Sequence, residues 1–115
     1  VQSAMRFPTR DVVLDGVEIK AGEKIYCMLS AANRDPAVFA EPDKFDIYRE
    51  NAQKHLSFAY GPHYCFGAPL ALLEGEVGLS ILLERLPRLA LHPDYPTAPV
   101  GHEFRATPTL FVTVS

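Results

Sequence analysis

Apolar and polar residues alternate near the N-terminus in a pattern that predicts short β-strands. The runs V-V-L, V-E-I and K-I-Y-C-M-L are separated by Asp15-Gly16 and by Ala21-Gly22. Asp-Gly between two apolar runs is a strong signal for a β-hairpin. Val17 and Ile19 share one face of their strand, which is the two-residue period of a half-buried strand. We therefore expect a small antiparallel sheet within residues 1–29.

The next part of the chain, residues 30–57, lacks a long periodic segment. Pro36 and Pro42 would interrupt any long helix, and Asn33 and Asp35 suit helix caps and turns. We expect two short helical turns, followed by an irregular connection that leads to a glycine-rich loop at residues 58–67.

The longest regular element is a helix predicted at residues 68–86. Pro69 fits its first turn, and Pro87 ends it. Polar residues recur every four positions at Glu76, Ser80 and Glu84, which predicts a single polar stripe. The remaining surface has two apolar faces, one of Ala71, Leu72, Leu79, Leu82, Leu83 and Leu86 and one of Leu70, Val77 and Ile81. Two such faces need neighbours on two sides.

The C-terminal part, residues 87–115, is predicted to be a β region. R-L-A-L is a candidate strand, a proline-rich loop follows, and T-L-F-V-T-V is rich in β-branched and aromatic residues. The fold class is thus mixed α and β. At 12.7 kDa we expect residues 1–115 to form one domain or part of one.

Composition and charge exclude several classes of partner. The chain is 48% hydrophobic and 22% charged, and no run of apolar residues is long enough to span a bilayer. The formal net charge is -3, and no basic stripe appears. We expect neither a nucleic-acid partner nor a membrane partner.

The cysteines indicate a reducing compartment. Cys27 lies in an apolar run, where we expect a small buried side chain, and Cys65 lies in the loop before the long helix. Their spacing shows no disulfide pattern and the N-terminus resembles no signal peptide, so we expect a cytoplasmic protein. Starting at Val1, the sequence reads as though it begins within a longer one.

The surroundings of Cys65 favour thiolate chemistry. The cysteine lies between Gly61-Pro62 and Gly67, immediately before the predicted helix. Helix N-termini favour anions, so free N–H groups directed at the sulfur would stabilise the thiolate, which ligates metals or attacks electrophiles. The glycines leave room for a bulky group to approach the main chain. These features alone leave the choice between a ligand, a nucleophile and a structural cysteine open.

The segment Phe58 to Gly67 resembles the cysteine-ligand loop of the cytochrome P-450 family of haem-thiolate monooxygenases. The family form F-G-x-G-x-H/R-x-C-x-G is matched at Phe58, Gly61, His63, Cys65 and Gly67, and the A-P-L-A that follows is similar to that of soluble bacterial members. The segments D-V-V-L-D-G-V-E-I-K-A-G-E, A-A-N-R-D-P-A-V-F and P-D-K-F-D also resemble the family. The resemblance implies the C-terminal part of the P-450 fold, with residues 30–57 including its meander.

The resemblance implies haem b as cofactor and assigns residues to it. Cys65 would be the axial ligand of the haem iron and its only metal ligand from this chain. Phe58 would pack beside the haem and shield the sulfur. Gly67 and Ala71 would let the start of the helix approach the porphyrin.

Two basic side chains and the N-terminal residues receive further roles from the resemblance. His63 and Arg6 would bind the haem propionates, Arg6 because a guanidinium can grip a carboxylate with two hydrogen bonds. The edge of the substrate pocket would be formed by Val1, Gln2, Ser3 and Ala4. No catalytic residue beyond the iron ligand is assigned within the chain.

The sequence gives less support to other metal sites. His55, His63 and Cys65 could hold zinc, but no fourth ligand stands at a recognisable spacing. His102-Glu103 lacks the second histidine of a zinc-protease helix.

Three positions depart from the family pattern. Ala59 replaces a usual glycine, which implies strain if that position needs a positive φ. Leu72 replaces an arginine that members direct toward an electron-transfer partner, which weakens the case for a ferredoxin-type donor. Lys44 stands where the meander more often has arginine, and we expect Arg49 to serve instead.

The resemblance implies a monooxygenase that inserts one oxygen atom from O2 into a small organic substrate. No segment matches the family's E-x-x-R helix or its distal helix, so we expect the isolated chain to be inactive and to need a missing N-terminal portion. The alternative is a natural truncated form without catalysis that acts as a haem-binding or oligomerising module.

Overall fold

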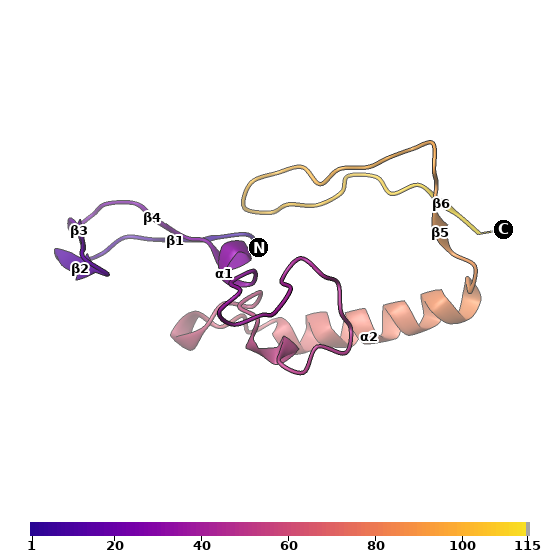
Figure 1. The fold of residues 1–115 in the computed structure, drawn as a ribbon, viewed down its shortest axis with the longest axis horizontal. Helices are drawn as coiled ribbons and strands as arrows, with labels where there is room; N and C mark the ends of the chain where they lie inside the picture. Colours follow the sequence, from indigo (N-terminus) through magenta and orange to yellow (C-terminus); the bar gives the residue numbers. More distant parts are fainter. Residues whose placement is uncertain (115) are drawn as a thin grey trace. The chain divides into compact units, whose positions relative to one another are not determined.

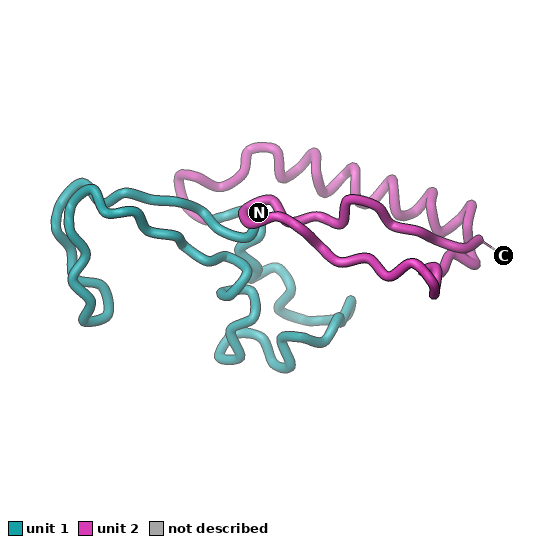
Figure 2. Tube along the Cα trace, turned by 90° about the horizontal axis from the view of Figure 1, so that it is seen from above, with its two compact units in different colours: residues 1–59 teal, residues 60–115 magenta. Residues whose placement is uncertain are grey.

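The computed structural model describes residues 1–114 and divides into two compact units. The first unit is Val1–Ala59, and the second begins at Tyr60. Figure 1 shows the helices and strands along the chain, and Figure 2 colours the two units. Each unit is described on its own.

The first unit contains two separate two-stranded antiparallel ribbons. Strand β2 (Val12–Leu14) pairs with β3 (Val17–Ile19), and β1 (Ala4–Arg6) pairs with β4 (Ile25–Cys27). The predicted hairpin is confirmed, because Asp15 and Gly16 both have the positive φ that its turn requires. The third predicted strand also forms, but its partner is β1, which the sequence pattern did not reveal.

The prediction that Cys27 is buried was wrong. Cys27 is an exposed free cysteine at the end of β4, and Tyr26 and Met28 beside it are also exposed. A two-stranded ribbon can bury a face only if another layer packs against it. Ile25 is half-buried whereas Tyr26 and Cys27 are exposed, so the ribbon covers only part of this strand and leaves the cysteine accessible.

The rest of the first unit holds the two helical turns that the sequence predicts. Helix α1 (Leu29–Ala32) is followed by a single turn in which the Phe39 amide donates to the Asp35 carbonyl at 2.8 Å. Phe39 is only 5% exposed and anchors the packing here. The short 3-10 helix η1 (Ala52–Lys54) interrupts the otherwise irregular connection that follows.

The second unit is organised around one long helix. The 3-10 turn η2 (Gly61–His63) precedes α2 (Ala68–Arg85), which ends one residue before the predicted boundary. Both C-terminal strands form, but they are shorter than predicted: β5 (Ala90–Leu91) pairs antiparallel with β6 (Val112–Thr113). No helix of the described residues is long and apolar enough to cross a membrane.

Candidate functional site

The loop that carries Cys65 starts with an unusual backbone path. Ala59 has φ +63° and Gly61 has φ +70°, so two residues close together adopt the left-handed region. The loop therefore does need a positive φ at Ala59, as the comparison with the family pattern suggested. A residue with a Cβ atom is sterically disfavoured in that region, whereas glycine is not. The Ala59 amide donates to the Leu56 carbonyl at 2.9 Å, which helps to hold the bend.

The approach to this loop is fixed by Asn33, at the C-terminal end of α1. Its Oδ1 accepts the Leu56 amide at 2.6 Å, and its Nδ2 donates to Ser57 Oγ at 3.1 Å. The His55 ring lies 5.8 Å from the Phe58 ring, centroid to centroid. One amide side chain thus ties the first helix to the segment that leads into Phe58. Sequence reasoning identified Asn33 as a capping residue but gave no signal for this long-range role.

Cys65 lies shortly before α2, but the first amide of the helix is not directed at the sulfur. The Ala68 amide donates to the Cys65 carbonyl oxygen at 3.1 Å, and the Ala71 amide donates to the Gly67 carbonyl at 3.0 Å. Gly67 is the N-cap and has no side chain to cap the helix. Ala68 is only 1% exposed, so the first turn of α2 is closely packed at this residue. The expectation that helix amides point at the sulfur therefore needs correction for Ala68, because its amide donates its hydrogen bond to the Cys65 carbonyl oxygen instead.

The residue that carries the sulfur is exposed. Cys65 is an exposed free cysteine, and Phe66 after it is fully exposed. A Cβ built on Gly67 would lie 3.7 Å from the Cys65 Sγ, so a side chain at that position would line the sulfur. Glycine leaves that approach open.

The chemistry of these donors fits haem. No aspartate, glutamate, lysine or arginine occurs between Lys54 and Glu74, so the segment that carries the cysteine contributes no carboxylate, ammonium or guanidinium group. A single thiolate on such a segment suits a flat apolar macrocycle that brings its own nitrogen ligands. Among residues 1–114, no group of three histidine, cysteine, aspartate or glutamate side chains is placed to hold a metal ion, so the zinc alternative gains no support.

The remaining predicted site residues are distributed over both units. In the second unit, His63 is the exposed last residue of η2 and Ala71 is exposed on α2. In the first unit, Arg6 is exposed at the end of β1, and its Nη1 donates to the Met5 carbonyl at 2.8 Å.

The N-terminal residues assigned to the substrate pocket differ in exposure. Val1 is exposed, Gln2 and Ala4 are half-buried, and Ser3 is only 3% exposed. The Gln2 carbonyl accepts the Ser30 amide at 3.0 Å, which ties this segment to α1. The Ser3 hydroxyl is buried without a hydrogen-bond partner.

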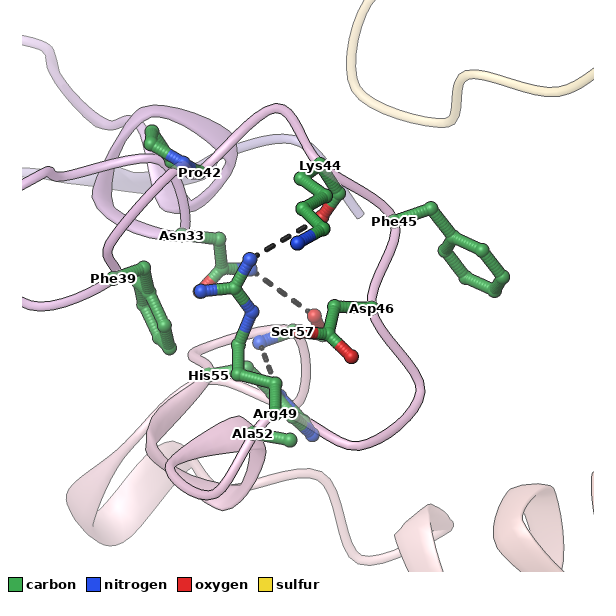
Figure 3. Close-up of a pocket in the computed structure, with 10 residues that line it drawn as sticks. All are labelled: Asn33, Phe39, Pro42, Lys44, Phe45, Asp46, Arg49, Ala52, His55 and Ser57. Carbon is green, nitrogen blue, oxygen red and sulfur yellow. Dashed lines mark hydrogen bonds between the residues drawn. The ribbon is translucent and has the colours of Figure 1, made fainter.

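A cavity of about 410 Å³ lies in the first unit beside the segment that Asn33 holds. Figure 3 shows the Arg49 guanidinium at its centre, with Phe39 on one side and Asp46 on the other. The guanidinium donates to the carbonyls of Ala40, Glu41 and Lys44 at 2.6, 3.1 and 3.2 Å. These contacts show that Arg49 bridges carbonyls of residues 40–44, and its service in place of an arginine at position 44 stays a prediction.

Comparison with known proteins decides the family. The family model described as Cytochrome P450 matches residues 1–99. The chain belongs to the cytochrome P450 family. It is 52% identical over 84 residues to the 20-oxo-5-O-mycaminosyltylactone 23-monooxygenase of Streptomyces fradiae, which is 73% of this chain and 20% of that protein. It is 46% identical over 90 residues to the biotin biosynthesis cytochrome P450 of Bacillus subtilis, which is 78% of this chain and 22% of that one.

A solved P450 structure has the same fold over nearly the whole chain. The crystal structure of P450BioI in complex with an acyl carrier protein ligated to hexadec-9Z-enoic acid matches with a TM-score of 0.89 at 42% identity. The match covers 99% of this chain and 29% of that one. The chain thus has a bacterial-type P450 fold, and it spans about a fifth of the length of its curated relatives.

Proposed function

We propose that this chain is the haem-thiolate-binding, C-terminal portion of a P450 monooxygenase, with Cys65 as the axial iron ligand. The observation that carries the proposal is the exposed Cys65 shortly before α2, in a stretch of the chain without carboxylates, lysines or arginines. Residues 1–115 are then one partial domain of the larger fold. The unpaired cysteines fit the cytoplasm.

The residues proposed to hold haem b act in different ways. Cys65 supplies the thiolate, and Gly67 and Ala71 keep side chains short along the start of the helix. Phe58 shields the sulfur from water. His63 and Arg6 bind the propionates, which suits an exposed imidazole and an exposed guanidinium. When bound through a thiolate, haem supplies the iron at which O2 is activated for insertion of one oxygen atom into an organic substrate.

The proposed partners follow from the same assignment. Val1, Gln2, Ser3 and Ala4 contribute one edge of the pocket for a small organic substrate. A ferredoxin-type protein supplies electrons to the complete monooxygenase. Because Leu72 is 59% exposed where members carry arginine, this chain offers such a donor no cation at that position.

A ferrous–CO spectrum tests the proposal. The purified chain is mixed with haem, together with the complementing N-terminal portion of a P450, then reduced and exposed to CO. We expect the red-shifted Soret band of a thiolate-ligated haem. Cys65→Ala should abolish this band, whereas Cys27→Ala, which removes the other exposed cysteine, should leave it unchanged. The same band in Cys65→Ala would refute the assignment.

The alternative is a natural short form that binds haem or a partner without catalysis. Its motivation is the extensive exposed apolar surface of α2. It predicts no turnover by the 115 residues alone. Robust oxygen insertion by the isolated chain would contradict it.

A further inference from the structure

The turn between β2 and β3 places an aspartate directly before a glycine at an exposed position. Asp15 and Gly16 form the two-residue loop that joins Leu14 to Val17, with φ +50° and +80°. Both residues are exposed. A Cβ built on Gly16 would meet no heavy atom beyond its chain neighbours within 4 Å, so the space beside this main chain is open. No other aspartate or asparagine of the sequence precedes a glycine.

The Asp15 carboxylate has no partner among residues 1–114. The hydrogen bonds and ion pairs of these residues do not include its oxygens, although Lys20 of the same ribbon pairs with Asp11 and Glu18. Among the turn and loop hydrogen bonds of the described residues, none uses the Gly16 amide. An unpaired carboxyl group therefore lies next to a main-chain nitrogen that carries no bulky neighbour.

The structure distinguishes Asp15 from the other residues of its kind. Apart from Asp94, the remaining aspartates and asparagines form hydrogen bonds through their side chains: Asp11, Asn33, Asp35, Asp43, Asp46 and Asn51. Asp94 is followed by Tyr95, whose side chain hinders an approach of the intervening amide. Asp15 alone combines an unpaired side chain with a following glycine.

We propose that Asp15 is a modification site at which the Gly16 amide nitrogen forms a ring with the Asp15 side chain. The nitrogen attacks Cγ of the neutral carboxyl group, a C–N bond forms, and one water leaves with the carboxyl hydroxyl and the amide proton. The product is a succinimide. Water then opens the ring: addition at Cγ restores aspartate, and addition at the main-chain carbonyl gives isoaspartate. The sequence of steps consumes no reactant besides water.

Isoaspartate changes the tip of the hairpin, because it adds one carbon to the main chain of the turn. A two-residue loop with both φ positive matches the twist of the paired strands, and a longer loop does not keep that match. The pairing of Leu14 with Val17 should therefore be lost first. At the base of the ribbon, the Ala21 amide donates to Asp11 Oδ1 at 2.9 Å, so this end stays tied.

The test follows the purified 115-residue chain over time at neutral pH. Trypsin releases residues 11–20 as one peptide, and the endoprotease Asp-N cuts this peptide before Asp15 but not before isoaspartate. We expect an Asp-N-resistant form of unchanged mass to accumulate, together with a form lighter by one water. In the isomerised chain, hydrogen exchange of residues 13–18 should accelerate at least about tenfold, because the strand ends open locally.

Two substitutions that fit the turn provide controls. Asp15→Gly removes the carboxyl group and keeps a pair that adopts positive φ, so it should give neither an isomeric nor a dehydrated peptide. Asp15→Asn keeps a favoured turn and should form isoaspartate at least about tenfold faster, because at neutral pH aspartate side chains are ionised and a carboxylate resists attack. The amide nitrogen then leaves as ammonia.

Two results would overturn the proposal. One is isomerisation of Asp15 in urea but not in the folded chain, because the turn would then protect the residue. The other is isomerisation of Asp94 as fast as that of Asp15, because the unpaired side chain and the glycine would then not select the site. The inference does not depend on haem, so the CO test of Cys65 is unaffected by either result.

Discussion

Asn33 Oδ1 accepts the Leu56 amide at 2.6 Å, 23 positions further along the chain. The contact joins the end of α1 to the segment that enters the cysteine loop. Asn33→Ala should destabilise residues 55–58 by about 1–3 kcal/mol, because a partly buried amide loses its partner. Hydrogen exchange at Leu56 measures the effect. Asn33→Asp keeps the acceptor and should cost less; equal exchange in wild type and Asn33→Ala would contradict the role.

The left-handed residues of the loop predict opposite effects of glycine and alanine. Ala59→Gly should stabilise the loop by about 1 kcal/mol, since glycine adopts φ +63° without a Cβ penalty. Gly61→Ala, at φ +70°, should destabilise it by a similar amount. Urea titration followed by hydrogen exchange of the loop measures both. Two changes of the same sign would show that backbone strain does not control this loop.

The Arg49 guanidinium holds three carbonyls of the connection before η1. Arg49→Lys should destabilise the first unit by about 2 kcal/mol, because an ammonium cannot reproduce the planar arrangement of donors. Arg34→Lys is the matched control: Arg34 pairs with Asp43 at 2.9 Å, but both side chains are more than 60% exposed. Such a pair contributes little, so the control should change stability by less than about 1 kcal/mol. Comparable losses in the two variants would argue against the carbonyl contacts.

The β2–β3 ribbon should lose stability in acid through Asp11. Hydrogen bonds from the Ala21 amide and the Lys20 side chain lower the pKa of Asp11 below its usual 3.8. A carboxyl group with a lowered folded pKa stabilises the fold above its unfolded pKa, and that contribution disappears as the pH falls through the folded value. NMR titration of the Asp11 carboxyl carbon gives the folded pKa. Asp11→Asn should remove this part of the acid dependence; a pKa at or above 3.8 would disprove the linkage.

The sequence predicted those elements whose signal is local. Asp15-Gly16 defines its hairpin, and Pro69 and Pro87 bracket α2, so both elements are found where expected. The cysteine motif is contiguous and was recognised without the fold. Strand β4 shows the limit, because its partner β1 lies about twenty residues earlier and carries no pairing signal. Cys27 was misassigned for the same reason: burial depends on the layers that cover a strand, and an apolar run does not reveal them.

The candidate site residues were assigned by resemblance and stay predictions; Arg6 belongs to the first unit and Cys65 to the second. The role of Asn33 depends on a main-chain amide 23 positions away, and Arg49 was expected to serve in the meander by resemblance but without its carbonyl partners. No spacing rule encodes such contacts. They became visible only when the path of the irregular connection was known.

The absence of lysine and arginine on both sides of Cys65 also determines where trypsin can cut the protein. Trypsin cleaves after lysine and arginine, and neither occurs between Lys54 and Arg85. A complete digest therefore leaves the whole cysteine loop and all of α2 in one peptide that begins at His55, while Cys27 falls in another. Alkylation of the two cysteines can thus be measured separately by mass spectrometry, and protection of Cys65 alone would report directly on what covers the sulfur.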